Sequence, residues 1–176
     1  VQTCALPILA REFCQKHSAI FVHPFDDPRT IAGQGTVALE ILKQLKTSPD
    51  MVLCPIGGGG LAAGMSICIK NKKPKIQVIG VEPAGAACMA ESFRKKQPIT
   101  LAKIDKFVDG AAVKTPGVLT FQICRKFLKT ICVEPEGKIC QTMLDLYQQD
   151  GVITEPAGAL TISALSTLGK AVRGKT

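Results

Sequence analysis

Four consecutive glycines, at residues 57–60, separate an apolar run of strand length from a segment of helical composition. The run over residues 51–56 predicts a buried strand, and a helix is expected to begin at Leu61. Glycine permits positive φ and close approach to its backbone N–H groups, and a turn that opens a helix directs several N–H groups and the positive end of the helix dipole to one point. The pattern therefore predicts a site for a phosphate or another dianion. The alternative is a flexible glycine loop that binds nothing.

Strand patterns alternate with helix patterns along the chain. Strands are predicted at 19–23, 51–56, 76–82, 131–133 and 152–154. Helices are predicted to end near residue 16, to start at Thr30, and to cover 61–72, 86–96, 117–129, the apolar face from 139 to 147, and 157–168. This alternation predicts an α/β fold, a parallel sheet with helices on both faces. Ligands of such sheets bind beyond the carboxyl ends of the strands, where the glycine turn lies.

Three Glu-Pro pairs also follow predicted strands, and the pentapeptide Glu-Pro-Ala-Gly-Ala occurs twice, at 82–86 and 155–159. Proline suits the first turn of a helix and glutamate complements the helix dipole. This structural role suffices for Glu134. For Glu82 and Glu155, lining the ligand site is an equal alternative.

The composition excludes several classes of protein. The net charge of +8 is not gathered into a basic stripe with aromatic residues, since Trp is absent and Tyr occurs once, so no nucleic-acid partner is expected. The eight cysteines lack the close pairs of zinc sites, which favours reduced thiols in the cytoplasm. No apolar run approaches the roughly 20 residues that cross a bilayer, so no membrane partner is expected.

Two kinds of phosphate ligand fit the glycine turn. Gly58-x-Gly60-x-x-Ala63 satisfies the looser dinucleotide pattern, and Glu82 ends the next predicted strand about twenty residues later, where a ribose-binding acid is expected. This favours an NAD-binding Rossmann domain of an oxidoreductase. A Walker loop is excluded because no Lys-Ser/Thr pair follows the glycines. The other ligand is a small cofactor with a single phosphate.

Five segments favour the small cofactor. In order, they are Phe21-Val-His-Pro-Phe-Asp-Asp-Pro28, Ile31-Ala-Gly-Gln-Gly-Thr36, Gly57-Gly-Gly-Gly-Leu61, Val108-Asp-Gly110 and Glu155-Pro-Ala-Gly-Ala159. Over about residues 10–168 the chain resembles the threonine dehydratase (threonine ammonia-lyase) family, in the tryptophan synthase β-like, fold type II class of pyridoxal phosphate enzymes. The resemblance implies pyridoxal 5'-phosphate as cofactor and deamination of L-threonine to 2-oxobutanoate and ammonia, in isoleucine biosynthesis. A serine dehydratase or serine racemase activity is the alternative within the class.

The resemblance also assigns roles to residues. It implies that Phe25 and Glu155 are adjacent to the amino-acid substrate and that Gly110 approaches the cofactor ring. It implies a phosphate cup of backbone N–H groups, formed by Gly57, Gly58, Gly59, Gly60 and Leu61. Some relatives bind a metal where Glu82 lies, but the later acid is replaced by Cys88, so no metal is expected.

The resemblance finally implies an incomplete domain. No lysine here has the sequence context of the family's Schiff-base lysine, which is expected N-terminal to this chain, so no catalytic residue is assigned. We expect residues 1–8 to be foreign or a ragged edge and residues 9–176 to be part of the large, cofactor-binding domain. The small domain and the Schiff-base lysine segment are expected to be absent, and family habit implies a homo-oligomer.

Overall fold

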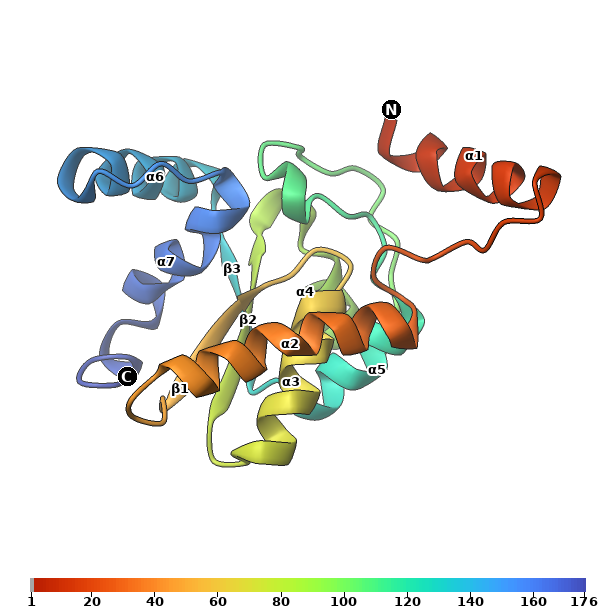
Figure 1. Ribbon diagram of the computed structural model, residues 1–176. Helices are drawn as coiled ribbons and strands as arrows, with labels where there is room; N and C mark the ends of the chain where they lie inside the picture. Colours follow the sequence, from red (N-terminus) through yellow and green to blue (C-terminus); the bar gives the residue numbers. More distant parts are fainter. Residues whose placement is uncertain (1) are drawn as a thin grey trace.

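A three-stranded parallel sheet forms the centre of the molecule (Figure 1). The computed structural model describes residues 2–176, with side chains from residue 8 onwards. The strands are β1 (Met51–Pro55), β2 (Gln77–Pro83) and β3 (Thr130–Glu134), in the order β1-β2-β3. Since all three run in the same direction, their carboxyl ends meet at one edge of the sheet, as the sequence predicted for a parallel α/β fold.

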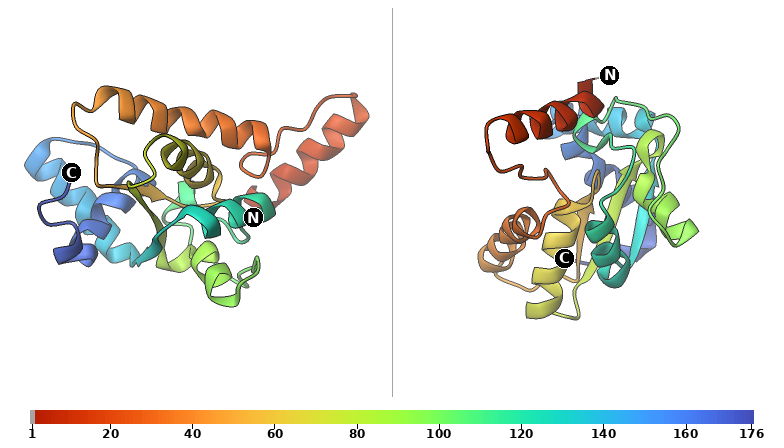
Figure 2. Two further views of the ribbon diagram at one scale, coloured as in Figure 1. Left: turned by 90° about the horizontal axis from the view of Figure 1, so that it is seen from below. Right: turned by 90° about the vertical axis from the view of Figure 1, so that its right-hand side faces the viewer.

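Helices cover both faces of the sheet, which confirms the predicted architecture (Figures 1 and 2). One face carries α2 (Pro28–Gln44), α3 (Gly60–Lys72) and α5 (Val118–Phe127), with α4 (Cys88–Lys95) beside α5. The other carries α6 (Glu136–Asp150) and α7 (Pro156–Leu168). Short 3₁₀ turns are η1 (Ala84–Ala86), η2 (Asp109–Ala111) and η3 (Gly169–Ala171).

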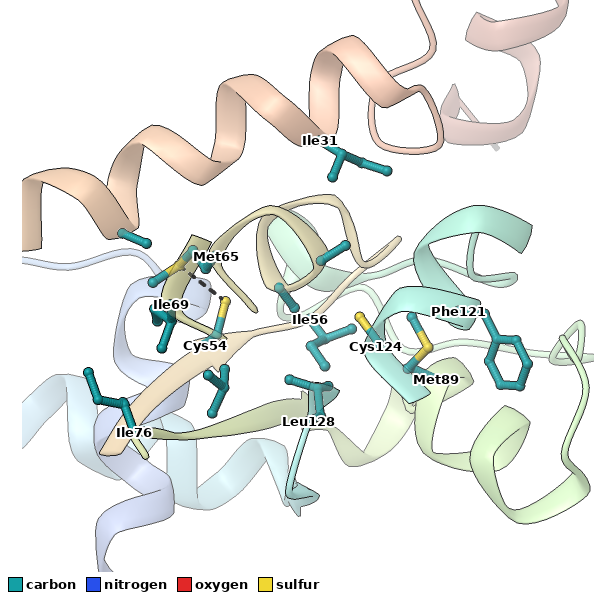
Figure 3. Packing of buried hydrophobic residues seen from close by; sticks show 14 residues of the cluster. Ile31, Cys54, Ile56, Met65, Ile69, Ile76, Met89, Phe121, Cys124 and Leu128 are labelled. Carbon is teal, nitrogen blue, oxygen red and sulfur yellow. Dashed lines mark hydrogen bonds between the residues drawn. The ribbon is translucent and has the colours of Figure 1, made fainter. Parts of the chain in front are cut away.

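Two hydrophobic clusters hold these layers together, one on each face of the sheet. The first includes Ile56, which directly follows β1, together with Ile69 from α3 and Phe121 from α5 (Figure 3). The second joins Val81 of β2 to Leu160 of α7. β2 is the middle strand, and all of its residues except Gln77 are buried, as expected for a central parallel strand.

The predicted strands at 19–23 and 152–154 are wrong. Both segments are irregular, and no neighbouring strand lies beside them among residues 2–176. Their apolar side chains face outwards, with Ile20 76% and Ile153 85% exposed. A strand pattern gives a strand only where a partner supplies hydrogen bonds. The apolar face predicted for α6 is also only partly buried, because Ile139 is inside while Tyr147 is exposed.

The N-cap residue of α2 differs from the predicted one, Thr30. Asp27 is the N-cap residue of α2, and its Oδ1 accepts the N–H of Arg29 at 2.8 Å. Thr30 lies inside the helix and donates its hydroxyl to the carbonyl of His23 instead. α1 (Gln2–Lys16) lies away from the sheet (Figure 1). Of the predicted edge segment 1–8, Val1 lies outside the described residues and the remainder begins α1.

Candidate functional site

A cleft of ≈ 440 Å³ lies at the carboxyl edge of the sheet. It brings together four segments that are distant in the sequence, and every residue predicted to face the cofactor or the substrate lines it. These residues are Phe25, Gly57, Gly58, Gly59, Gly60, Leu61, Gly110 and Glu155. The sequence did not single out Gln34 of α2 or Val113 after η2, which also line the cleft.

The glycine turn connects β1 directly to α3, as predicted. Ile56 makes the last bond to β2, donating its N–H to the carbonyl of Val81 at 2.8 Å. Gly59 then adopts φ 94° and is the N-cap residue of α3. This left-handed conformation favours glycine, and a Cβ atom at residue 59 would also lie 2.6 Å from Met89 Cε. The turn is therefore closed against the protein on one side.

The carbonyl groups of the turn face the protein interior. The Gly57 oxygen accepts a weak bond from Cys88 Sγ at 3.7 Å. The Gly58 oxygen accepts the Thr120 hydroxyl at 2.7 Å. The Gly59 oxygen accepts the N–H of Ala63 at 2.9 Å, with Cys124 Sγ at 3.9 Å. Each of these three oxygens is thereby fixed.

The orientation of the carbonyls determines that of the N–H groups. In a planar trans peptide the N–H points opposite to the C=O, so the N–H groups of residues 58–60 point away from the interior, towards the cleft. Within residues 2–176, the N–H groups of residues 57–61 have no hydrogen-bond acceptor. Buried or half-buried N–H groups need a partner, and the α3 dipole adds positive potential at this end. The turn fits a phosphate group.

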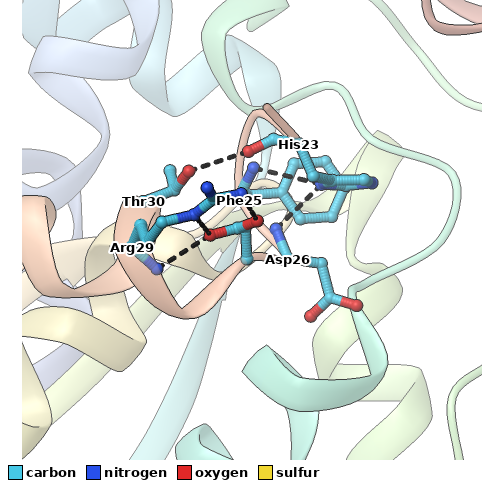
Figure 4. A network of polar contacts seen from close by, with 6 residues as sticks. His23, Phe25, Asp26, Arg29 and Thr30 are labelled. Carbon is cyan, nitrogen blue, oxygen red and sulfur yellow. Dashed lines mark hydrogen bonds and ion pairs between the residues drawn. The ribbon is translucent and has the colours of Figure 1, made fainter. Parts of the chain in front are cut away.

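Phe25 closes the cleft next to the turn. A Cβ atom at residue 58 would overlap the Phe25 ring, so the close contact requires a glycine there. The loop that carries Phe25 is shaped by His23, whose Nδ1 accepts the N–H groups of Phe25 at 3.3 Å and Asp26 at 2.9 Å (Figure 4). The two rings also pack edge to face, with centroids 4.7 Å apart.

Glu155, the N-cap residue of α7, also lines the cleft. It is exposed and makes no capping bond to its own helix. A Cβ atom at residue 110 would lie 3.0 Å from Ala157 Cβ and 3.7 Å from Glu155 Oε1. The small size of Gly110 therefore lets η2 approach the first turn of α7, which places Glu155 beside the cleft.

Glu82 does not line the cleft, so the alternative in which its carboxylate faces the ligand is wrong. Its carboxylate is fully buried and accepts the N–H groups of Met89 at 2.8 Å and Ala90 at 2.7 Å, at the start of α4. Burial raises the pKa of Glu82 to about 7, although these two N–H bonds act in the opposite direction. Glu134 is also buried and structural, with Lys138 Nζ 2.7 Å from its Oε2.

The thiols near the turn are buried and neutral. Burial raises the pKa of Cys54 and of Cys88 to about 12, and it raises the pKa of Cys124 still further. Among the described residues, no three His, Cys, Asp or Glu side chains form a group that could hold a metal ion. No helix within residues 2–176 has both the length and the apolar character that crossing a membrane would demand.

A parallel α/β sheet with a cradle of N–H groups at its carboxyl edge defines a class of proteins that bind small anionic ligands. Within that class, the pyridoxal-phosphate dependent enzyme family matches residues 4–176. The chain belongs to this family.

Among individual members of the family, the chain is similar to biosynthetic threonine dehydratases. The chain is 50% identical to the biosynthetic L-threonine dehydratase IlvA of Halalkalibacterium halodurans, over 95% of this chain and 40% of that protein. It is 48% identical to the same enzyme of Bacillus subtilis, over 94% of this chain and 39% of that protein. The chain thus spans about two fifths of the length of these curated relatives.

Solved structures of a threonine deaminase and of a serine racemase both superpose on the chain. The processed form of threonine deaminase isoform 2 from Solanum lycopersicum superposes with a TM-score of 0.87 at 35% identity, covering 94% of this chain and 48% of that one. Maize serine racemase gives a TM-score of 0.86 at 30% identity, covering 94% and 53%.

Proposed function

We propose that the full-length protein that carries this sequence is a pyridoxal-phosphate-dependent threonine ammonia-lyase. It deaminates L-threonine to 2-oxobutanoate and ammonia, as a cytoplasmic enzyme of isoleucine biosynthesis. The observation that carries the proposal is the cradle of outward-facing N–H groups at residues 57–61, in a chain that is 50% identical to a biosynthetic threonine dehydratase.

The residues of the cleft divide the work of binding. The N–H groups of the glycine turn and Leu61 hold the phosphate without any positive side chain, as oriented backbone amides can. Gly110 leaves room for the cofactor ring, while Phe25 and Glu155 border the amino-acid substrate and position it. When bound, pyridoxal phosphate supplies an electron sink for the carbon that loses its proton.

The catalytic lysine is not assigned to any residue of this chain. We propose that residues 9–176 are part of the large, cofactor-binding domain and that the lysine and the small domain belong to the rest of the full-length protein. The share of its relatives that the chain spans, about two fifths, supports this division. We further propose that the full-length protein is a homo-oligomer.

A serine dehydratase or serine racemase is the second candidate, since the similarity to maize serine racemase favours it. The NAD-binding alternative lacks support, because the acid that would bind the ribose is Glu82, which is buried and occupied by α4. The two remaining candidates differ in substrate. Release of 2-oxobutanoate from threonine supports the lyase, whereas a preference for serine or the appearance of D-serine supports the second candidate.

The test is cofactor uptake by the full-length protein and by two glycine variants. The wild-type protein is expected to develop the visible absorption band of bound pyridoxal phosphate, which changes when threonine is added. Gly59→Ala is expected to lose at least about 90% of that uptake, because residue 59 has positive φ and no space for a Cβ.

Gly137→Ala is the matched control, because a Cβ there meets nothing within 4 Å. It is expected to bind the cofactor as the wild-type protein does. A wild-type protein that takes up no pyridoxal phosphate would contradict the proposed function, and an unaffected Gly59→Ala variant would contradict the assignment of the cradle.

A further inference from the structure

A carboxylate from the Phe25 loop caps a helix that lies far along the chain. Asp26 Oδ2 accepts the N–H of Val118 at 3.0 Å, and its Oδ1 accepts the N–H of Thr120 at 3.0 Å. These N–H groups belong to the first turn of α5, which has no acceptor of its own for them. The residue before α5 is Gly117, which offers no capping side chain. A Cβ there would overlap the Asp26 carboxylate, so the glycine makes room for the distant cap.

The first turn of α5 in turn holds the glycine turn. The Thr120 hydroxyl, fully buried, donates to the carbonyl of Gly58 at 2.7 Å. The N–H of Gly117 donates to the same oxygen at 3.2 Å. Two donors from one helix end therefore fix the peptide between residues 58 and 59, whose N–H faces the cleft.

We propose that Asp26 and Thr120 are positioning residues for the phosphate cradle. Asp26 fixes the first turn of α5, and Thr120 then holds the Gly58 carbonyl so that the N–H of Gly59 points at the ligand phosphate. This inference rests on the proposed function, since it assigns an orienting role to residues behind the proposed phosphate site.

The arrangement also couples the cradle to the wall of the cleft. Phe25 precedes Asp26, and its ring lies against Gly58. One dipeptide therefore contacts the turn directly through an aromatic ring and indirectly through α5. The side chain of Asp26 points towards the start of α5 while that of Phe25 points elsewhere (Figure 4). A shift of this loop would move the substrate wall and the phosphate cradle together.

The carboxylate of the next residue, Asp27, has a different structural role, so a variant at this residue serves as a control. Asp27 caps its own helix, α2, and pairs with Arg29 at 3.0 Å on the exposed surface. The Arg29 guanidinium holds the pKa of Asp27 at about 2. Within residues 2–176, the side-chain hydrogen bonds of the Asp27 carboxylate go to Arg29, and none reaches the glycine turn or α5.

The experiment compares Thr120→Val, Thr120→Ser, Asp26→Asn and Asp27→Asn in the full-length protein. The dissociation constant for pyridoxal phosphate is measured on the apoprotein, and the ³¹P chemical shift is recorded on the loaded protein. Thr120→Val removes the donor of a buried hydrogen bond, and Asp26→Asn removes one acceptor of a partly buried cap. Both variants are expected to weaken cofactor binding about 5- to 100-fold. Both variants are also expected to shift the ³¹P resonance, which a loss of global stability alone does not do.

Thr120→Ser retains the hydroxyl and is expected to restore affinity to within about threefold of the wild type, as is Asp27→Asn. Wild-type affinity and ³¹P shift in both Thr120→Val and Asp26→Asn would overturn the inference. If Thr120→Val does not fold, Asp26→Asn decides, because its amide keeps one acceptor and nearly the same shape. A wild-type protein that binds no pyridoxal phosphate would instead refute the proposed function, so the two failures are distinct.

Discussion

The two Glu-Pro-Ala-Gly-Ala segments, 82–86 and 155–159, have the same sequence, but the first glutamate is buried and the second is exposed. In the first, η1 follows β2 and α4 begins only at residue 88, so the carboxylate of Glu82 turns back to cap α4 and is buried. In the second, α7 begins at once with Pro156, so Glu155 is itself the N-cap residue and its side chain is free to face the cleft. The start of the next helix, rather than the pentapeptide, decides which glutamate belongs to the site.

Removing the two glutamates should separate these roles most strongly. Glu82→Ala leaves two N–H groups at the start of α4 without an acceptor and opens a cavity, so it is expected to lower the free energy of unfolding by about 3 kcal/mol. Glu155→Ala, at an exposed site, should change it by less than about 0.5 kcal/mol. Urea denaturation of the full-length protein and hydrogen exchange at Met89 and Ala90 measure the difference. Equal losses in the two variants would show that the carboxylates are equivalent after all.

The dependence of stability on pH offers a second test. Burial raises the pKa of Glu82 from 4.5 in the unfolded chain to about 7, so the folded state keeps a proton that the unfolded state releases between these values. Stability should therefore fall as pH rises from about 5 to 7, by roughly 2 kcal/mol, and level off above that range. Glu82→Gln, which carries no proton equilibrium, should remove this part of the slope. A slope unchanged in Glu82→Gln would contradict the raised pKa.

The smallest contrast concerns the glycines of the two pentapeptides. A Cβ at residue 85 would overlap Asp105 Cβ and come within 2.8 Å of Glu136 Oε1, next to backbone that cannot move aside. One at residue 158 would overlap only the Thr154 hydroxyl oxygen, which can turn away if it gives up its hydrogen bond to the carbonyl of Glu155. Gly85→Ala is expected to lower the free energy of unfolding by about 1–2 kcal/mol. Gly158→Ala should change the free energy of unfolding by less than about 1 kcal/mol, because the higher helix propensity of alanine offsets the loss of the Thr154 hydrogen bond. The melting temperatures of the two full-length variants measure the difference. A larger fall in melting temperature for Gly158→Ala than for Gly85→Ala would contradict the prediction.

Local patterns predicted the parts of the fold that local physics decides. The glycine turn, the helix that begins beside it and the strand 76–82 follow from apolar runs and from glycine's conformational freedom. Strands at 19–23 and 152–154 were predicted wrongly because a short apolar run does not show whether a partner strand lies alongside. The glycine turn was predicted to face a ligand from its own residue pattern, whereas Phe25 and Gly110 were predicted to face the cleft by family resemblance.

The contacts behind the cleft could not be predicted from the sequence. Thr120 carries no signal of its own, because a threonine in the first turn of a helix is unremarkable in any sequence. Its partner in the cap, Asp26, is separated from it by 94 positions. The sequence does not distinguish Glu82 from Glu155, because both begin the same pentapeptide. In both cases the deciding information is three-dimensional.

The distance in sequence between Asp26 and Thr120 also sets an order of events during synthesis. When the ribosome has made residues 1–61, every N–H donor of the cradle exists, but nothing yet holds the carbonyl groups of the turn in place. Only after residue 120 has emerged can α5 dock on Asp26 and close a loop of nearly a hundred residues. The nascent chain should therefore bind an anion only at a late stage of synthesis, well after β1 and α3 have been made.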